Sequence, residues 1–387
     1  MSKRKFLPAL PAALIPIYGT TMADVLCYTL MIPLLPELAA RYHATYFIAG
    51  TLISVPALCS MFSSPVWGRI SDRVGRKFII VFSQAVTLLG YVLLALAHSM
   101  LWIFIARIIS GLGAGNISAV QSYIADVTSE RQRDEAFALY GVVFGAAFIL
   151  GPVTSAFLMR RGVQFPFSVA ALLELFNILF TVALIPASIG KHRREASLKQ
   201  IVKAAIQPAV RRLFIRQFLF VFAVVYFLAG FALYLHAALD VGIERVAWLM
   251  AGAGIVGAIV QGVVVSPLAA RIGDRLTAQA GFVALLLGYG FLYWVHDFMA
   301  FVAVFCLWAI GAAMVEPTIM ALLSLRIPAR QRGALMGVGD SLNNVALVIA
   351  PAASGAIIGA NAQMIGILPA LATAAALVVG YPPLRSR

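Results

Sequence analysis

Long uncharged, apolar stretches alternate with short charged stretches along almost the whole chain. Each apolar stretch has about 20 residues or more, which is the length that an α-helix needs to cross the hydrocarbon core of a bilayer. The pattern therefore predicts an all-α, polytopic membrane protein with twelve transmembrane helices. The predicted spans are residues 10–34, 45–66, 78–98, 100–125, 135–159, 164–187, 214–239, 246–268, 278–296, 298–325, 333–358 and 363–382.

One polar connection is much longer than the others. The segment KHRREASLKQIVKAAIQPAVRRLFIR follows the sixth span and carries eight lysine and arginine residues. It divides the predicted spans into two groups of six. We therefore predict an N-terminal six-helix bundle at residues 1–187, a basic cytoplasmic linker at 188–213 and a C-terminal six-helix bundle at 214–387.

The composition supports a membrane protein. Hydrophobic residues make up 62% of the chain and charged residues 11%, whereas soluble domains have roughly 45–50% and 25%. The first apolar stretch follows a basic segment, as in a signal peptide. It is about 25 residues long, however, and exceeds the roughly 7–15 apolar residues of a signal peptide. We interpret it as the first membrane span.

The cysteines and glycines indicate no cofactor chemistry. Cys27, Cys59 and Cys306 all fall within predicted spans, where a free cysteine behaves as a small hydrophobic residue. The segment GLGAGN at 111–116 lacks the third glycine and the preceding strand of a dinucleotide-binding turn. No phosphate-binding G-x-x-x-x-G-K-[ST] segment occurs either, so ATP is not expected to drive the protein directly. We expect no cofactor and no metal, and neither an enzyme nor a membrane-embedded sensor.

Positive charges are distributed unevenly between the two sides of the predicted helices. If the N-terminus is cytoplasmic, 24 of the 29 lysine and arginine residues lie in cytoplasmic segments, four lie on the opposite side and Arg107 lies inside a span. This is the positive-inside pattern that sets membrane orientation. It accounts for the net charge of +14 without a nucleic-acid partner. We expect a monomer in the inner (plasma) membrane, with both termini in the cytoplasm.

The chain also repeats itself at about half its length. SPVWGRISDR at 64–73 returns as SPLAARIGDR at 266–275, an offset of 202 residues, and RQR at 131–133 returns at 330–332, an offset of 199. The two bundles are therefore expected to be parallel, pseudo-symmetric repeats related by an axis along the membrane normal. This is the arrangement of the two halves of major facilitator transporters.

Specific segments resemble that family. GRISDRVGRK, from Gly68 to Lys77, matches the major facilitator signature G-x-x-x-D-R-x-G-R-[RK] at every specified position. ARIISGLGAGN and YIADVTSERQRDEAFALYG are similar to the fourth helix and following loop of the twelve-helix drug:proton antiporters, especially the tetracycline efflux proteins. AFILGPVTSAF resembles their antiporter signature, although Ala138, Ala147 and Ser155 stand where that signature prefers glycine.

This resemblance implies a function. The expected activity is proton-coupled export of amphipathic or drug-like small molecules by alternating access, with protons, a small-molecule substrate and the lipid bilayer as partners. The alternative is a transporter for a defined metabolite, such as an organic anion or a siderophore, in which Arg107 binds a carboxylate of the substrate.

Charged residues inside predicted spans are the candidates for proton coupling. A charge at the centre of a membrane helix costs at least about 2.5–3.5 kcal/mol, so it persists mainly beside a cavity or a partner. Asp24 and Arg107 lie on helices that, by the resemblance, both line a central cavity, and an Asp–Arg interaction there would tie protonation to substrate binding. A static buried pair is the alternative. The candidates are Asp24, Arg107, Glu174 and Glu316.

Polar and aromatic residues within the spans are candidates for binding substrate. Such residues more often hydrogen-bond between helices, where each bond contributes about 0.6–2 kcal/mol. The candidates are Tyr28, Asn116, Gln121, Tyr234, Gln261 and Asn344.

The repeated charged segments, at 64–73 and 266–275, are the candidates for a cytoplasmic gate. The resemblance implies that Asp72 faces a helix N-terminus in the other half and that Arg76 pairs with Asp126. In the second copy Leu-Thr-Ala at 276–278 replaces Val-Gly-Arg, so a weaker contact is expected there. The candidate gating residues are Gly68, Asp72, Arg73, Gly75, Arg76, Asp126, Gly151, Pro152, Asp274 and Arg275.

Overall fold

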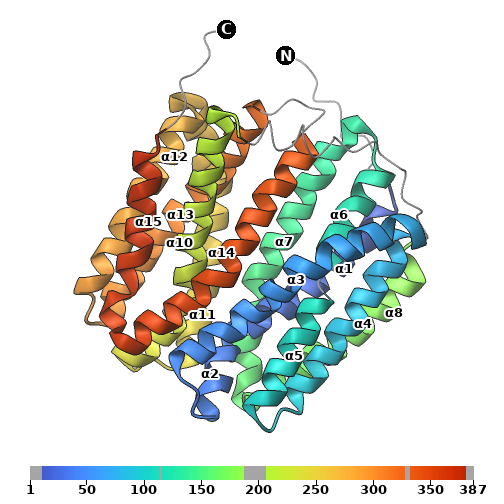
Figure 1. Cartoon of the computed structure of the whole chain (residues 1–387), viewed down its shortest axis with the longest axis horizontal. Coiled ribbons are helices and arrows are strands. Elements are labelled where there is room, and N and C mark those ends of the chain that lie inside the picture. The colour runs from blue at the N-terminus through green and yellow to red at the C-terminus, as the bar shows by residue number, and fades with distance from the viewer. Residues whose placement is uncertain (1–10, 114–115, 187–205, 327–331, 381–387) are drawn as a thin grey trace. The chain divides into compact units, whose positions relative to one another are not determined.

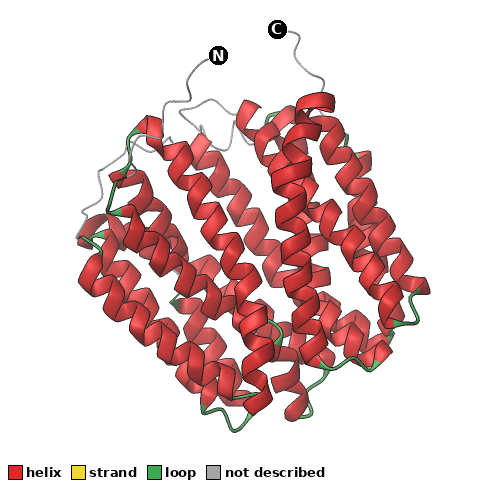
Figure 2. Ribbon diagram, turned by 180° about the vertical axis from the view of Figure 1, so that it is seen from behind, coloured by secondary structure: helices red, strands yellow, loops and turns green. Residues whose placement is uncertain are grey.

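The computed structural model describes residues 11–113, 116–186, 206–326 and 332–380. Within these ranges the regular structure is helical and no strand occurs (Figure 2). The chain divides into two compact units. We call them unit 1, formed from Met1–Leu34 and Cys59–Arg193, and unit 2, formed from Leu35–Leu58 and Arg194–Arg387.

Unit 1 contains the N-terminal helices labelled in Figure 1, with the second part of α3 (Tyr46–Val74). A short 3₁₀ segment, η1 (Met159–Arg161), follows its longest complete helix. The helices of this unit are α1 (Leu14–Met31), α4 (Arg76–Ala95), α5 (Met100–Leu112), α6 (Asn116–Val127), α7 (Glu130–Leu158) and α8 (Phe165–Leu184).

Unit 2 contains the C-terminal helices, almost all of the short helix α2 (Leu34–Arg41) and the first part of α3. Its remaining elements are α10 (Pro208–Leu239), α11 (Ile243–Ile259), the π-helical segment η2 (Val260–Val265), α12 (Ser266–Phe291), η3 (Leu292–Trp294), α13 (Phe298–Arg326), α14 (Arg332–Ala360), η5 (Ala362–Gly366) and α15 (Ile367–Val378).

The predicted spans are found as helices. Ten helical stretches of the described chain are long and apolar enough to cross a membrane. One of them, Glu244–Trp294, has 51 residues and contains both the eighth and the ninth predicted spans, and the shorter apolar helix Ala362–Val378 corresponds to the twelfth. The all-α, polytopic fold is therefore confirmed. The predicted domain boundaries stay a prediction, and residues 187–205 of the predicted linker lie outside the described residues.

Some helix ends differ from the predicted spans because helices continue past the apolar stretch. The seventh span was predicted to begin at residue 214, but α10 begins at Pro208. Proline suits the first turn of a helix, since the amide hydrogen that it lacks has no partner there. The fifth was predicted from residue 135, but α7 begins at Glu130, where Ser129 and Gln132 form a capping box.

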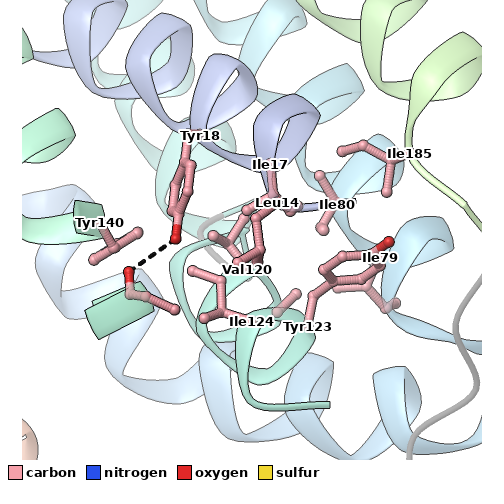
Figure 3. Packing of buried hydrophobic residues seen from close by; sticks show 12 residues of the cluster. Leu14, Ile17, Tyr18, Ile79, Ile80, Val120, Tyr123, Ile124, Tyr140 and Ile185 are labelled. Atoms are coloured by element: carbon pink, nitrogen blue, oxygen red, sulfur yellow. Dashed lines mark hydrogen bonds between the residues drawn. The ribbon is translucent and has the colours of Figure 1, made fainter. Parts of the chain in front are cut away.

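The core of unit 1 is built from apolar residues of several helices around Tyr18 (Figure 3). The Tyr18 hydroxyl donates a hydrogen bond to the main-chain oxygen of Ala136, at 3.0 Å. The bond joins α1 to α7 and satisfies a buried hydroxyl that would otherwise be costly. The cluster consists of Leu14, Ile17, Tyr18, Ile79, Ile80, Ala119, Val120, Tyr123, Ile124, Ala136, Tyr140 and Ile185.

A second contact brings α1 and α7 very close together. The Thr29 hydroxyl donates to the main-chain oxygens of Val25 at 2.8 Å and of Ala147 at 3.1 Å. One turn further along α7, Gly151 faces Thr29 so closely that a Cβ there would overlap the Thr29 hydroxyl and approach the Leu30 amide nitrogen to 2.8 Å. Gly151, which was predicted to be a gating residue, therefore acts at least as a packing residue.

The core of unit 2 is aromatic. Phe227 of α10 packs against Tyr289 of α12 and Trp308 of α13, with ring centroids 5.6 and 5.1 Å away. The Trp308 indole donates to the Tyr289 hydroxyl at 2.9 Å. Edge-on and tilted aromatic pairs of this kind contribute about 0.5–1.5 kcal/mol beyond their buried area.

The close contact at Gly151 gives a stability prediction. Gly151→Ala should lower the free energy of unfolding by about 1–3 kcal/mol, the usual cost of overpacking a core. The measurement is thermal unfolding of the purified full-length protein in detergent. Gly145→Ala is the matched control, because a Cβ at Gly145 in the same helix meets nothing within 4 Å. Equal melting temperatures for the two variants would contradict the packing role.

Candidate functional site

Asp24 lies in the middle of α1 and accepts hydrogen bonds from amide side chains on other helices of unit 1. Gln84 of α4 donates its Nε2 to Asp24 Oδ1 at 3.2 Å, and Asn177 of α8 donates its Nδ2 to the same oxygen at 2.6 Å. Asn116 of α6 donates its Nδ2 to the other oxygen, Asp24 Oδ2. The amide dipoles stabilise the carboxylate without adding a formal charge.

Glu174 is the second acid of this site. It lies one turn before Asn177 in α8, so the two side chains share a face of the helix. Its side chain is 1% exposed, and its carboxyl group lies close enough to Asp24 to interact with it. Two carboxyl groups at this distance cannot both carry a full negative charge without repulsion, so the pair favours binding of a positive species.

Arg107 was predicted to interact with Asp24, and that interaction stays a prediction. Arg107 is buried in α5, with an exposed fraction of 2%, and lies within electrostatic range of Tyr28 and Tyr91. Tyr91 in turn lies within range of both Asp24 and Arg107. The coupling role of Arg107 stays a prediction.

Two residues of the site were missed from the sequence. Gln84 and Asn177 both bond Asp24, yet neither was among the predicted site residues. Asn177 had a usable signal, since it stands three residues after the intramembrane Glu174. Gln84 had only its polarity within an apolar span.

Glu316 lies in unit 2, in α13, directly before Pro317 inside the helix. Its side chain is exposed. The Thr318 hydroxyl donates to the main-chain oxygens of Met314 and Val315, at 2.7 and 2.9 Å, in the turn where proline removes a donor. The structure therefore shows an exposed carboxyl group beside a proline within a continuous helix, and its role in proton coupling stays a prediction.

The predicted substrate-binding residues are found in different environments. Tyr28 is 43% exposed, one turn from Asp24. Asn116 bonds Asp24, as described above, and Gln121 lies close to Tyr140 of α7. These contacts tie Asn116 and Gln121 to neighbouring helices of unit 1.

In unit 2 the candidates also differ. Tyr234 is fully buried, and its hydroxyl donates to the Val295 oxygen at 3.4 Å, so it packs in the core of unit 2. Gln261 is exposed within the π-helical segment and Asn344 is half-buried in α14. Their roles in binding stay predictions.

Arg76 forms the centre of a charged cluster where α3 ends and α4 begins. Its Nη1 lies 2.6 Å from Asp72 Oδ1 and 3.1 Å from the Ser71 hydroxyl, and its Nε lies 3.2 Å from Asp126 Oδ2 in α6. The expected Arg76–Asp126 pair is thus present. The contact predicted between Asp72 and the other half of the chain stays a prediction, as does the gating function.

Gly75 shapes this cluster. It has φ 102° and ψ 149°, between α3 and α4, a conformation that essentially only glycine adopts. Arg73 next to the bend is exposed, and a Cβ at Gly68 would meet nothing within 4 Å. Pro152, at the far end of α7, is buried.

The second charged segment, at 266–275, aligns with the first, at 64–73, in a different register from the one predicted from the sequence. In α12 the corresponding bend is at Gly273, with φ 83° and ψ 155°. Matching the two glycines gives an offset of 198 residues in place of 202, so Asp274 stands at the position of Arg76 and not at that of Asp72. The offset differs because the backbone bend, and not the identity of the residues, determines which positions of the two repeats are equivalent. The second copy therefore carries an acid where the first carries its central base.

The described residues contain no group of three or more histidine, cysteine, aspartate or glutamate side chains that could hold a metal ion. The site around Asp24 and Glu174 consists of carboxyl groups and amides among apolar helices. Such an arrangement can take up and release a positive ion within the membrane, and acids in this position mark the ion and substrate pathways of transporters. The fold and the site define a polytopic membrane transporter.

Sequence comparison identifies the family. The Major Facilitator Superfamily profile matches residues 17–244 and 219–386. The chain is 30% identical to the class C tetracycline resistance protein of Escherichia coli over 389 residues, covering 96% of each protein. It is 24% identical to multidrug resistance protein 2 of Bacillus subtilis (strain 168), covering 86% of this chain and 85% of that protein. This chain belongs to the Major Facilitator Superfamily.

Solved structures agree on the fold. The nucleoside transporter NupG has a TM-score of 0.79 at 12% identity, with 95% of this chain and 98% of that chain covered. The human organic anion transporter MFSD10 (TETRAN) has a TM-score of 0.72 at 19% identity, with 96% of this chain and 100% of that chain covered. At these identities the likeness concerns the fold alone.

The Arg76 cluster gives a second stability prediction. Asp126→Asn should lower the free energy of unfolding by about 1 kcal/mol or more, because it removes a charged partner from a buried guanidinium. Asp274→Asn should change it by less than about 0.5 kcal/mol, since Asp274 has no ion pair among the described residues. Thermal unfolding of both purified variants in detergent measures the difference. Equal losses would mean that the two copies are equivalent.

Proposed function

We propose that this protein exports amphipathic or drug-like small molecules from the cytoplasm in exchange for protons, by alternating access. The observation that carries the proposal is the carboxyl pair inside unit 1 formed by the half-buried Asp24 and the buried Glu174, in which amides from α4, α6 and α8 hold Asp24. A carboxyl group that can be neutral or charged at a fixed place in the membrane is what proton coupling requires.

The relatives support the drug-export part of this proposal. The class C tetracycline resistance protein and multidrug resistance protein 2 carry resistance to drugs in their names, and this chain matches both over most of its length. For this chain we propose planar or amphipathic drug-like molecules as substrates, entering near Tyr28, whose side chain is exposed one turn from Asp24.

The Arg76 cluster supports alternating access. The ion pairs among Asp72, Arg76 and Asp126 lie at helix ends, where they can form and break as those ends move. We propose that they stabilise the state that is closed to the cytoplasm. We further propose a monomer with cytoplasmic termini and no nucleic-acid partner, as the charge distribution along the sequence indicates.

A second candidate function is transport of a defined metabolite that carries a carboxylate. The observation that favours it is the placement of Arg107, a buried guanidinium within electrostatic range of the exposed Tyr28. A guanidinium is well suited to hold a carboxylate with two parallel hydrogen bonds.

A transport assay tests the proposed function. In proteoliposomes with an imposed pH gradient, the wild-type protein should accumulate tetracycline or a cationic dye, and a protonophore should abolish the accumulation. Asp24→Asn keeps the volume of the side chain but removes its charge and its proton site, so it should abolish gradient-driven accumulation. Cooperative thermal unfolding of the variant shows that it still folds, with a lower melting temperature because one acceptor of the amide bonds becomes a donor. Accumulation by the variant at the wild-type rate would contradict the proposal.

The substrate range separates the two candidate functions. Gradient-driven transport of several unrelated amphipathic compounds supports drug export. A single saturable anionic substrate, lost in Arg107→Gln, would instead support the metabolite transporter.

A further inference from the structure

Three buried oxygen atoms around Asp24 accept no hydrogen bond from any described residue. They are Gln84 Oε1, Asn116 Oδ1 and Glu174 Oε2. Gln84 and Glu174 are each 1% exposed. Buried acceptors without a donor are rare in native proteins, because each costs the full desolvation of a polar group. It is therefore notable that three occur on residues that surround one carboxylate.

The residues that carry these oxygens all lie next to Asp24. Gln84 and Asn116 donate their amide nitrogens to Asp24. An amide carries its oxygen on the same carbon as its nitrogen, so each amide oxygen lies within a few ångströms of the carboxylate. Glu174 approaches the same carboxyl group from α8. The result is a set of oxygen acceptors on four helices of one unit.

We propose that Asp24, Glu174, Gln84 and Asn116 form a binding site for a small, hard monovalent cation, with Na⁺ as the species that fits. The ligands are carboxylate and amide oxygens, which suit hard cations, whereas copper and zinc prefer imidazole and thiolate. The Cys27 thiol of the same helix donates to the Ala170 oxygen instead.

The surrounding charges decide between a monovalent and a divalent ion. Asp24 and Glu174 together carry two negative charges when both are ionised. Arg107 carries one positive charge, and Tyr91 lies within electrostatic range of Arg107 and of both acids. One negative charge then remains, and one monovalent cation neutralises it. A divalent cation would leave an excess positive charge inside the membrane, which is costly.

The burial decides between an ion and an organic amine. Both Gln84 and Glu174 are almost completely enclosed by protein, so a substituted ammonium group could not reach their oxygens without displacing side chains. A proton alone would satisfy Glu174 and leave the two amide oxygens without a donor. A bare cation can contact all of these oxygens at once.

The cation site deepens the proposed function. It rests on that function only in taking the Asp24–Glu174 pair to be the place where ion movement is coupled to export. Protons and Na⁺ are then alternative occupants of one place, and they compete. The titratable or charged groups that face the cluster are Cys27 on α1, Tyr91 on α4, Arg107 on α5 and Tyr140 on α7. Of these only Arg107 is charged at neutral pH, so the competition is governed by the two acids.

Equilibrium binding of radiolabelled Na⁺ to the purified full-length protein in detergent tests the proposal. The buffer is choline chloride at constant ionic strength, without any drug or pH gradient. The wild-type protein should bind Na⁺ saturably, and acidification should weaken the binding. Glu174→Gln should abolish it. Gln84→Met, which keeps the length of the side chain but removes the oxygen, should lower the affinity by about tenfold or more.

The control is Asp297→Asn, which removes a carboxylate before α13 in unit 2 but retains the oxygen that accepts the Ala300 amide. It should bind Na⁺ as the wild type does. Absence of saturable Na⁺ binding to the wild type, or equal binding by wild type and Gln84→Met, would overturn the cation site. Proton-driven transport in sodium-free choline medium tests the proposed function separately, because that assay contains no Na⁺.

Discussion

The carboxylate of Asp24 in the middle of an apolar helix is the constraint on which the polar structure of unit 1 depends. A charge at this depth costs at least about 2.5–3.5 kcal/mol unless the protein supplies partners. The protein supplies them from α4, α6 and α8, which contribute one amide each. These bonds also align the helices, because each amide must stand at the height of Asp24. The site and the packing of the unit therefore have the same origin.

The charged residues at the helix ends have a different task from those inside the bundle. Arg76 is held by Asp72, Ser71 and Asp126 beside the bend at Gly75. These contacts lie at the helix ends and include the partly exposed Asp72, whereas the contacts of Asp24 lie in the middle of an apolar helix. A transporter needs both kinds: an enclosed group that retains an ion and a set of contacts at the helix ends that can open. In the part of the chain that the structure describes, both repeats have the glycine bend, but Asp274 follows it in the second repeat where Arg76 follows it in the first.

The fold could be predicted closely because bilayer thickness dictates span length. The predicted span 78–98 corresponds to α4 at Arg76–Ala95, and 298–325 corresponds to α13 at Phe298–Arg326. The eighth and ninth spans are separated in the structure only at Gly273, since the polar residues around Arg271 and Arg275 do not by themselves end a helix. Aligning the segments 64–73 and 266–275 by residue identity gave the wrong register because it compared side chains. The structurally equivalent positions are defined by the backbone bends at Gly75 and Gly273.

The sequence by itself determined the number of spans, the uneven charge, the family resemblance, the intramembrane acids and the Arg76–Asp126 pair. Only the tertiary structure decided that Gln84 and Asn177 bond Asp24, that Arg107 lies by Tyr28 and Tyr91, and that Tyr234 is enclosed in an aromatic core. In a water-soluble helix the apolar face marks the side that packs inward. In a membrane helix the lipid-facing side is apolar as well, so the sequence pattern does not show which face meets which neighbour, and only the packing of the helices does.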